Sequence, residues 1–216
     1  RDRIGDWSSD VCSSDLQSCI GANRVLVQSG IYDALADRIV ERMARLKVGN
    51  GLEPGVQVGP LIDKAAVRKS QELVDDALAQ GARLLSGGTC HALGGCFFQP
   101  TLLADVTHGM RIAREEIFGP VMPLVRFDND EEAITMANDS EYGLAAYLFS
   151  RDAARIWRNA ARIESGMVGI NCGLISNEVA PFGGVKQSGL GREGSHLGID
   201  EFLEVKYLCW DGLESA

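Results

Sequence analysis

Two segments of the sequence hold residue types that could do covalent chemistry. Near the start, Cys19 lies in residues 17–24 (QSCIGANR), a run of small and polar residues. A thiolate in such a setting is the best side-chain nucleophile at neutral pH, and the thioester it forms is labile to water. Near the end, residues 178–193 (EVAPFGGVKQSGLGRE) form a glycine-dense loop that can bring backbone close to a reacting group. By residue type alone, however, a cysteine is more often a small buried side chain than a nucleophile.

Neither a metal site nor a disulfide framework is expected. The six cysteines (12, 19, 90, 96, 172 and 209) form no CxxC pair, and the three histidines (91, 108 and 196) have no ligand-like spacing. The glycine run lacks the strand-turn-helix fingerprint of a phosphate cradle. Covalent thiol chemistry is therefore the main candidate.

Composition favours a cytoplasmic globular protein with no nucleic-acid or membrane partner. The chain has 216 residues, 45% of them hydrophobic and 24% charged, enough to bury a core. Its net charge of −9 and its lack of a Lys/Arg cluster argue against a nucleic-acid surface. No apolar run is long enough to cross a bilayer, and no secretory amino terminus is present.

Strand and helix patterns alternate after residue 24 and predict an α/β fold with a largely parallel sheet. Apolar residues 31 to 46 have helical spacing, with Ser29 as the N-cap and Gly49 as the stop. Asp63 should cap a second helix that Gly81 ends. Further helices are expected at 130–138 and 152–163, and strands at 25–27, 83–86, 98–106, 121–127, 145–150 and 167–171. The tail, 202–208, alternates as a strand with no partner nearby in sequence.

Taken in order, these motifs resemble the aldehyde dehydrogenase superfamily, and the late loop is closest to its succinate-semialdehyde branch. The resemblance implies a three-layer α/β catalytic domain and NAD or NADP as cofactor. It makes Cys19 the nucleophile that attacks the aldehyde, with its own backbone N–H helping to hold the oxyanion. Some members carry a second cysteine two residues later, where this chain has Gly21.

Residues 114–120 (REEIFGP) match the family's Glu-x-Phe-Gly-Pro motif. The resemblance implies that Glu116 accepts hydrogen bonds from the nicotinamide ribose and that Phe118 packs beside the nicotinamide. A carboxylate suits this role because it can accept from both hydroxyls. The alternative is a solvated Glu-Glu pair ahead of a Gly-Pro turn.

The loop after the last core strand supplies the candidate substrate residues. By resemblance, Ser176 in residues 171–178 (NCGLISNE) helps to bind the distal carboxylate of the substrate, and Phe182 lines the aldehyde pocket. Ser176 could instead satisfy only its own loop, and Phe182 could be ordinary core. We therefore expect a semialdehyde, succinate semialdehyde first. Other aldehydes, a thiol hydrolase and a structural subunit stay open.

The resemblance starts abruptly at Gln17. In residues 13–16 (SSDL) the chain lacks the Arg-Asn-small-Gly run of the family, so residues 1–16 are expected to be foreign; a divergent amino terminus is the alternative. The expected organisation is a catalytic domain at 17–198 and an oligomerisation strand at 199–216. The nucleotide-binding half and the general base are missing, so the chain alone should be inactive. The whole protein should be a homodimer or homotetramer.

Overall fold

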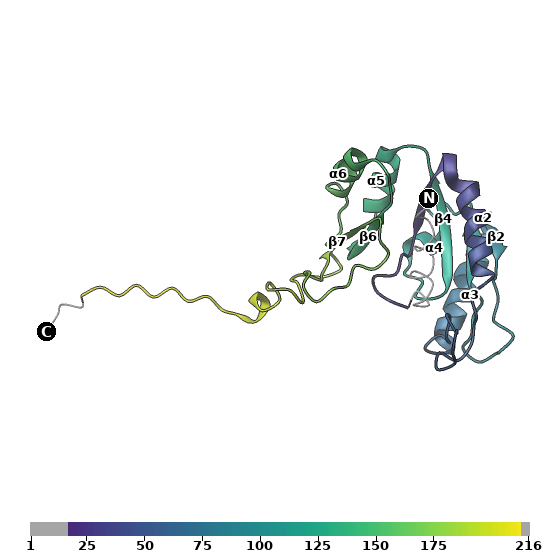
Figure 1. Ribbon diagram of the computed structural model, residues 1–216, viewed down its shortest axis with the longest axis horizontal. Helices are drawn as coiled ribbons and strands as arrows, with labels where there is room; N and C mark the ends of the chain where they lie inside the picture. Colours follow the sequence, from purple (N-terminus) through teal and green to yellow (C-terminus); the bar gives the residue numbers. More distant parts are fainter. Residues whose placement is uncertain (1–16, 213–216) are drawn as a thin grey trace.

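A four-stranded sheet with the order β1-β4-β3-β2 forms the centre of the fold (Figure 1). The structure, a computed structural model, describes residues 17–212, so the predicted foreign segment at 1–16 lies outside it. β1 and β4 are parallel, β3 and β4 are parallel, and β2 pairs antiparallel at one edge. The strands are β1 (Val25–Gln28), β2 (Arg83–Ser86), β3 (Thr101–Ala104) and β4 (Val121–Phe127).

Helices cover both faces of this sheet because the side chains of each strand alternate between them. One face packs on α2 (Tyr32–Met43), whose buried residues recur at helical spacing. The other packs on α3 (Lys64–Ala79) and the short α4 (Arg111–Arg114). Within β3, Leu102 lies in the α2 cluster and Leu103 in the α3 cluster. The result is the predicted three-layer arrangement.

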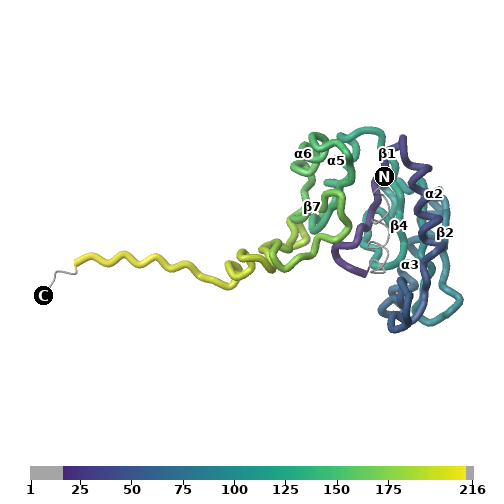
Figure 2. Tube along the Cα trace, viewed as in Figure 1, coloured from purple at the N-terminus to yellow at the C-terminus, as the bar shows by residue number. Residues whose placement is uncertain are grey.

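A second, smaller lobe lies beside the sheet (Figure 2). Its two parallel strands are joined by a helix, as a parallel pair requires. β5 and β8 add a short antiparallel pair. The elements are α5 (Asp130–Asn138), β5 (Tyr142–Gly143), β6 (Ala145–Leu148), α6 (Ala153–Ala160), β7 (Met167–Ile170) and β8 (Val185–Lys186).

Side-chain caps fix where three helices begin. Asp63, Asn129 and Asp152 each accept a hydrogen bond from a backbone N–H in the first turn of α3, α5 and α6. Such a cap stabilises a helix by about 1 kcal/mol. The Asp63 cap was predicted from the sequence, as was the end of α3 at Gly81, whose φ of 101° suits glycine.

The predicted cap and stop of the first helix were both wrong. Ser29 lies in a 3₁₀ turn (Ser29–Ile31) ahead of α2, and its hydroxyl donates to the Phe127 carbonyl at 3.1 Å and contacts the Asp128 carboxylate. The hydroxyl therefore ties the end of β1 to the end of β4. α2 ends at Met43, six positions before Gly49. The Arg45 N–H then bonds the Arg42 carbonyl and the Leu46 N–H bonds the Met43 carbonyl, the i→i+3 bonds of a tightened final turn.

The other predicted elements exist, and their ends differ from the predictions only in some cases. The strand predicted at 25–27 forms over β1, one residue longer, and those predicted at 145–150 and 167–171 form over β6 and β7, which end earlier. The predictions at 83–86, 121–127 and 130–138 match β2, β4 and α5. The predicted strand at 98–106 forms only over β3, and the predicted helix at 152–163 only over α6.

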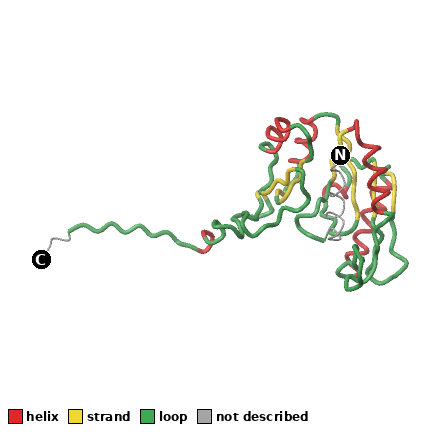
Figure 3. The backbone as a smooth tube through the Cα atoms, viewed as in Figure 1, coloured by secondary structure: helices red, strands yellow, loops and turns green. Residues whose placement is uncertain are grey.

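The predicted tail strand does not form within this chain. After a 3₁₀ turn at Asp200–Phe202, residues 203–212 run away from the fold with no regular structure (Figure 3). Val205 is 97% exposed and Trp210 80% exposed. No described strand lies beside the tail to accept its backbone hydrogen bonds. In residues 17–212, no helix has both the length and the apolar character needed to span a bilayer.

Candidate functional site

The predicted nucleophile lies in a tight turn that leads into β1. Cys19 is exposed, and the Gly21 N–H closes the turn by donating to the Ser18 carbonyl at 2.9 Å. From the second lobe, the Tyr147 hydroxyl donates to the Ile20 carbonyl at 2.7 Å. The thiol is therefore accessible while the backbone on both sides of it is fixed.

Tyr147 links this turn to the loop that follows β7. An added Cβ on Gly169 would lie 2.8 Å from the Tyr147 ring and 3.2 Å from the Cys172 carbonyl oxygen, so these groups pack around one point. Burial, with smaller effects of Cys172 and Cys19, raises the pKa of Tyr147 above its ordinary value. The hydroxyl therefore stays protonated and keeps its bond to Ile20.

The predicted cofactor residues lie in the loop after α4. Arg111 donates to the Glu115 carboxylate at 2.7 and 3.2 Å, and these bonds hold the pKa of Glu115 below its ordinary value. The Glu115 carboxylate is thus committed to Arg111, whereas Glu116 is exposed and faces a pocket. Phe118 is 37% exposed and has a φ of 52°, a left-handed conformation that is uncommon outside glycine.

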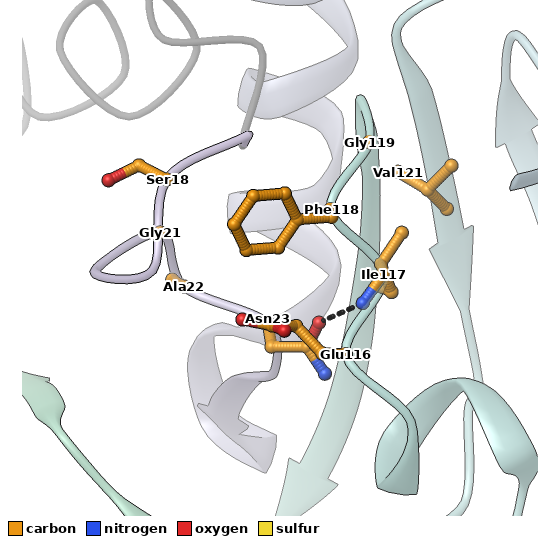
Figure 4. Close-up of a pocket in the computed structure, with 9 residues that line it drawn as sticks. All are labelled: Ser18, Gly21, Ala22, Asn23, Glu116, Ile117, Phe118, Gly119 and Val121. Carbon is orange, nitrogen blue, oxygen red and sulfur yellow. Dashed lines mark hydrogen bonds between the residues drawn. The ribbon is translucent and has the colours of Figure 1, made fainter. Parts of the chain in front are cut away.

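One side chain joins the nucleophile turn to this loop. The Asn23 Nδ2 donates to the Glu115 carbonyl at 3.0 Å, and its Oδ1 accepts from the Ile117 N–H at 2.8 Å. Figure 4 shows the pocket between the two segments, with Phe118 projecting toward the turn. The pocket is lined by Ser18, Gly21, Ala22, Asn23, Glu116, Ile117, Phe118, Gly119 and Val121. Segments about a hundred positions apart therefore make one site.

Arg24 fixes the same region from the other side. Its guanidinium donates to the Met136 carbonyl at 2.8 Å and the Ala137 carbonyl at 3.1 Å, at the end of α5. Burial is the main cause that lowers the pKa of Arg24 below its ordinary value. Arg24 thus holds the two lobes together and does not face the pocket.

The predicted substrate residues lie outside this pocket. Ser176 is exposed in the loop after β7. Phe182 exchanges two backbone hydrogen bonds with Glu193, at 2.9 and 2.7 Å, and lines a separate groove with Leu144, Leu190 and Ile199. The structure therefore brings the Cys19 turn, Glu116 and Phe118 together, and it does not add Ser176 or Phe182 to their pocket.

Sequence reasoning missed the two residues that hold the site together. Asn23 stood in the quoted run, but nothing in the sequence showed that its amide would bond residues 115 and 117. Tyr147 carried no motif signal, since it is one aromatic residue in a short strand. No cluster of His, Cys, Asp and Glu within residues 17–212 could hold a metal ion.

Comparison with known proteins agrees with these motifs. The sequence profile of the aldehyde dehydrogenase family matches residues 8–208. The chain is 55% identical over 197 residues to a glutarate-semialdehyde dehydrogenase of Pseudomonas aeruginosa, covering 91% of the chain and 41% of that protein. It is 52% identical to an NADP⁺ succinate-semialdehyde dehydrogenase of Escherichia coli, covering 89% of the chain and 40% of that protein.

Solved structures agree on the fold. A succinate-semialdehyde dehydrogenase from Burkholderia pseudomallei superposes with a TM-score of 0.91 at 55% identity, over 94% of this chain and 43% of that one. A betaine aldehyde dehydrogenase from Staphylococcus aureus in complex with NAD⁺ gives 0.87 at 36% identity, over 91% of this chain and 40% of that one. The chain thus spans about two fifths of the length of the relatives it matches. It belongs to the aldehyde dehydrogenase family.

Proposed function

We propose that this chain carries the thiol and nicotinamide-facing part of an NAD(P)-dependent semialdehyde dehydrogenase. The observation that supports this most is the placement of the Cys19 turn against the loop of Glu116 and Phe118, with Asn23 between them. Ser18 and Gly21, on either side of Cys19 in its turn, line the same pocket as Glu116. A nucleophile turn beside a cofactor-facing carboxylate is the arrangement that aldehyde oxidation through a covalent intermediate needs.

In the proposed reaction the Cys19 thiolate attacks the aldehyde carbon and forms a thiohemiacetal. The Cys19 backbone N–H can stabilise the developing oxyanion. Glu116 and Phe118 would hold a nicotinamide beside this carbon, and that group would supply the hydride acceptor. The resulting thioester on Cys19 is then hydrolysed by water, which releases the acid and restores the thiol.

The pocket residues fit a nicotinamide nucleotide. Glu116 is free to accept hydrogen bonds from the ribose hydroxyls, since Arg111 is paired with Glu115 instead. The exposed part of Phe118 offers an aromatic face beside the Cys19 turn. NAD and NADP are both compatible with Glu116 and Phe118, because the two cofactors differ only by a phosphate on the adenosine ribose, which these two residues would not contact.

Succinate semialdehyde is the first candidate substrate, and glutarate semialdehyde is the second. Both carry a distal carboxylate, which the exposed Ser176 hydroxyl could bind without adding charge. The P. aeruginosa and E. coli relatives are named for these two semialdehydes.

We also propose that the chain needs further structure to act. It covers about two fifths of the relatives, so we expect no reduction of NAD or NADP by the 216 residues alone. The exposed apolar tail after Phe202 fits a strand that pairs in a homodimer or homotetramer of the whole protein.

A chimera tests the proposal. Residues 17–216 are joined to the amino-terminal half of the P. aeruginosa relative, and the absorbance of reduced cofactor is followed with each semialdehyde and with propanal. Cys19→Ala should abolish activity, whereas Cys172→Ala, a change at another exposed cysteine near Tyr147, should retain it. Dehydrogenase activity in Cys19→Ala would refute the assignment. Cleavage of acyl esters without any aldehyde oxidation would favour the thiol hydrolase.

The same chimera tests the substrate class. Loss of one hydrogen bond to a charged group costs about 1.5–3 kcal/mol, so Ser176→Ala should lower kcat/KM for the preferred semialdehyde by roughly ten-fold or more. Propanal has no distal carboxylate and should be nearly unaffected. An equal drop for both aldehydes would mean that Ser176 shapes its loop and does not bind the substrate.

A further inference from the structure

We propose that Asn23 is a positioning residue that sets the place of Glu116 relative to the Cys19 thiol. This inference rests on the proposed function and extends it to a residue whose side-chain amide is bonded to the backbone of residues 115 and 117. The Asn23 amide binds the carbonyl of residue 115 and the N–H of residue 117, one on each side of Glu116. The two ends of the Asn23 amide therefore hold the backbone on both sides of Glu116, and we call this pair of hydrogen bonds the bracket.

The bracket has a fixed base. Asn23 comes two positions before Val25, which is buried and pairs in register with Leu124 of β4. Between them, Arg24 is held by two carbonyls of α5. The backbone of Asn23 is thereby anchored in the sheet, so its amide can hold the 115–117 segment in place.

The Cys19 turn does not depend on this amide. The Ser18–Gly21 hydrogen bond and the Tyr147–Ile20 hydrogen bond hold it separately. Loss of the Asn23 amide should therefore displace the Glu116 loop and leave the thiol where it is. This asymmetry separates a positioning role from general stabilisation.

The loop needs such support because its conformation is strained. Phe118 holds a φ of 52°, which a residue with a side chain adopts only when its surroundings impose it. Beyond it, Gly119 packs so closely on α3 that an added Cβ would lie 2.5 Å from the Ser70 Oγ. Asn23 holds one end of the strained segment and α3 the other.

Asn138 provides a matched control away from the pocket. Its Nδ2 donates to the Arg162 carbonyl at 2.8 Å, and its Oδ1 accepts from the Glu164 N–H at 2.9 Å. This is the same bracket, from the carbonyl of one residue to the N–H two positions later. Asn138→Ala removes the same two kinds of hydrogen bond as Asn23→Ala, outside the site.

The first readout is amide hydrogen exchange in the 216-residue chain, which needs no activity. Asn23→Ala should speed exchange in residues 115–119 by roughly ten-fold and leave 162–164 unchanged, and Asn138→Ala should do the reverse. If Asn23→Ala does not fold, Asn23→Asp, which keeps the acceptor for the Ile117 N–H, replaces it. Unchanged exchange at 115–119 would overturn the proposed bracket.

The second readout is kinetic and uses the chimera described above. Asn23→Ala should raise the KM for the dinucleotide by roughly ten-fold. The acylation of Cys19 by p-nitrophenyl acetate, in which the thiolate displaces p-nitrophenolate, should change less than two-fold. Asn138→Ala should change neither quantity.

The outcomes separate the two proposals. If Asn23→Ala slowed the acylation of Cys19 by the same factor as it raised the KM for the dinucleotide, its role would be merely structural. That result would overturn the positioning role. A wild-type chimera that oxidises no aldehyde would contradict the proposed function, and the exchange measurement would still decide whether the bracket exists.

Discussion

Replacing Gly119 by alanine tests how closely the loop of Glu116 and Phe118 packs on α3. A Cβ at this position would lie 2.5 Å from the Ser70 Oγ and 3.6 Å from the Ser70 Cβ. The first distance is a clash and the second an ordinary contact. Ser70 is fully buried, and its Oγ has no hydrogen-bond partner among the described residues. The clash therefore involves only the Ser70 Oγ, an atom that makes no hydrogen bond to the described residues.

These distances set the expected energies. Gly119→Ala in the wild type should destabilise the chain by about 1–3 kcal/mol, the usual cost of overpacking. Ser70→Ala alone should stabilise it by about 1 kcal/mol, because it removes a buried unpaired hydroxyl from a helix. With Ser70 already alanine, Gly119→Ala should cost less than about 1 kcal/mol. The two changes should therefore be coupled by about 1–2 kcal/mol.

Urea unfolding of the four variants measures this coupling. Gly109→Ala is the control, since an added Cβ there has no atom within 4 Å and should shift the unfolding free energy by less than about 0.5 kcal/mol. If Gly119→Ala lowered the free energy of unfolding equally in the wild type and in Ser70→Ala, the packing argument would be refuted. A destabilising Ser70→Ala would show that the hydroxyl does have a partner.

Three further predictions concern acid stability, the nucleophile turn and the tail. Hydrogen bonds from Arg155 and Asn159 lower the pKa of Asp130 below its ordinary value of 3.8, so this carboxylate stabilises the fold above that pH and the effect is lost as the pH falls below it. In urea titrations, wild type and Arg155→Met should differ in their free energy of unfolding by about 1 kcal/mol or less, because solvent screens this pair. That difference should shrink below pH 3.8. Tyr147→Phe removes the bond to the Ile20 carbonyl and should cost about 0.5–1.5 kcal/mol in thermal unfolding, and no cost would contradict the role given to Tyr147. Deleting residues 203–216 should leave the free energy of unfolding within about 0.5 kcal/mol of the wild-type value and should reduce self-association in sedimentation. A large loss of unfolding free energy would mean that the tail packs on the fold.

Local patterns predicted most elements because each depends on a few neighbouring residues. The apolar spacing and the Asp63 cap of α3 lie within a single stretch of sequence, and both were confirmed. The Ser29 prediction failed for the opposite reason. A cap serine and a serine that binds a strand nearly a hundred positions away are indistinguishable in sequence, and here the Phe127 carbonyl competes for the hydroxyl.

The tail shows the same limit. Its alternation at 202–208 is a true strand pattern, but a strand forms only where another backbone accepts its hydrogen bonds. None of the described strands does so, and the tail stays unpaired in the single chain.

The sequence by itself determined the family motifs, the alternation of strands and helices, and the candidates Cys19, Glu116 and Phe118. Residue identity carries those signals directly. Only the tertiary structure decided that Asn23 bridges to residues 115 and 117, that Tyr147 holds the turn at Ile20, and that Phe182 lines a groove of its own. Each of these depends on a contact between segments that are far apart in the chain. Their distance is fixed by how the sheet and its helices pack, which no single stretch of sequence encodes.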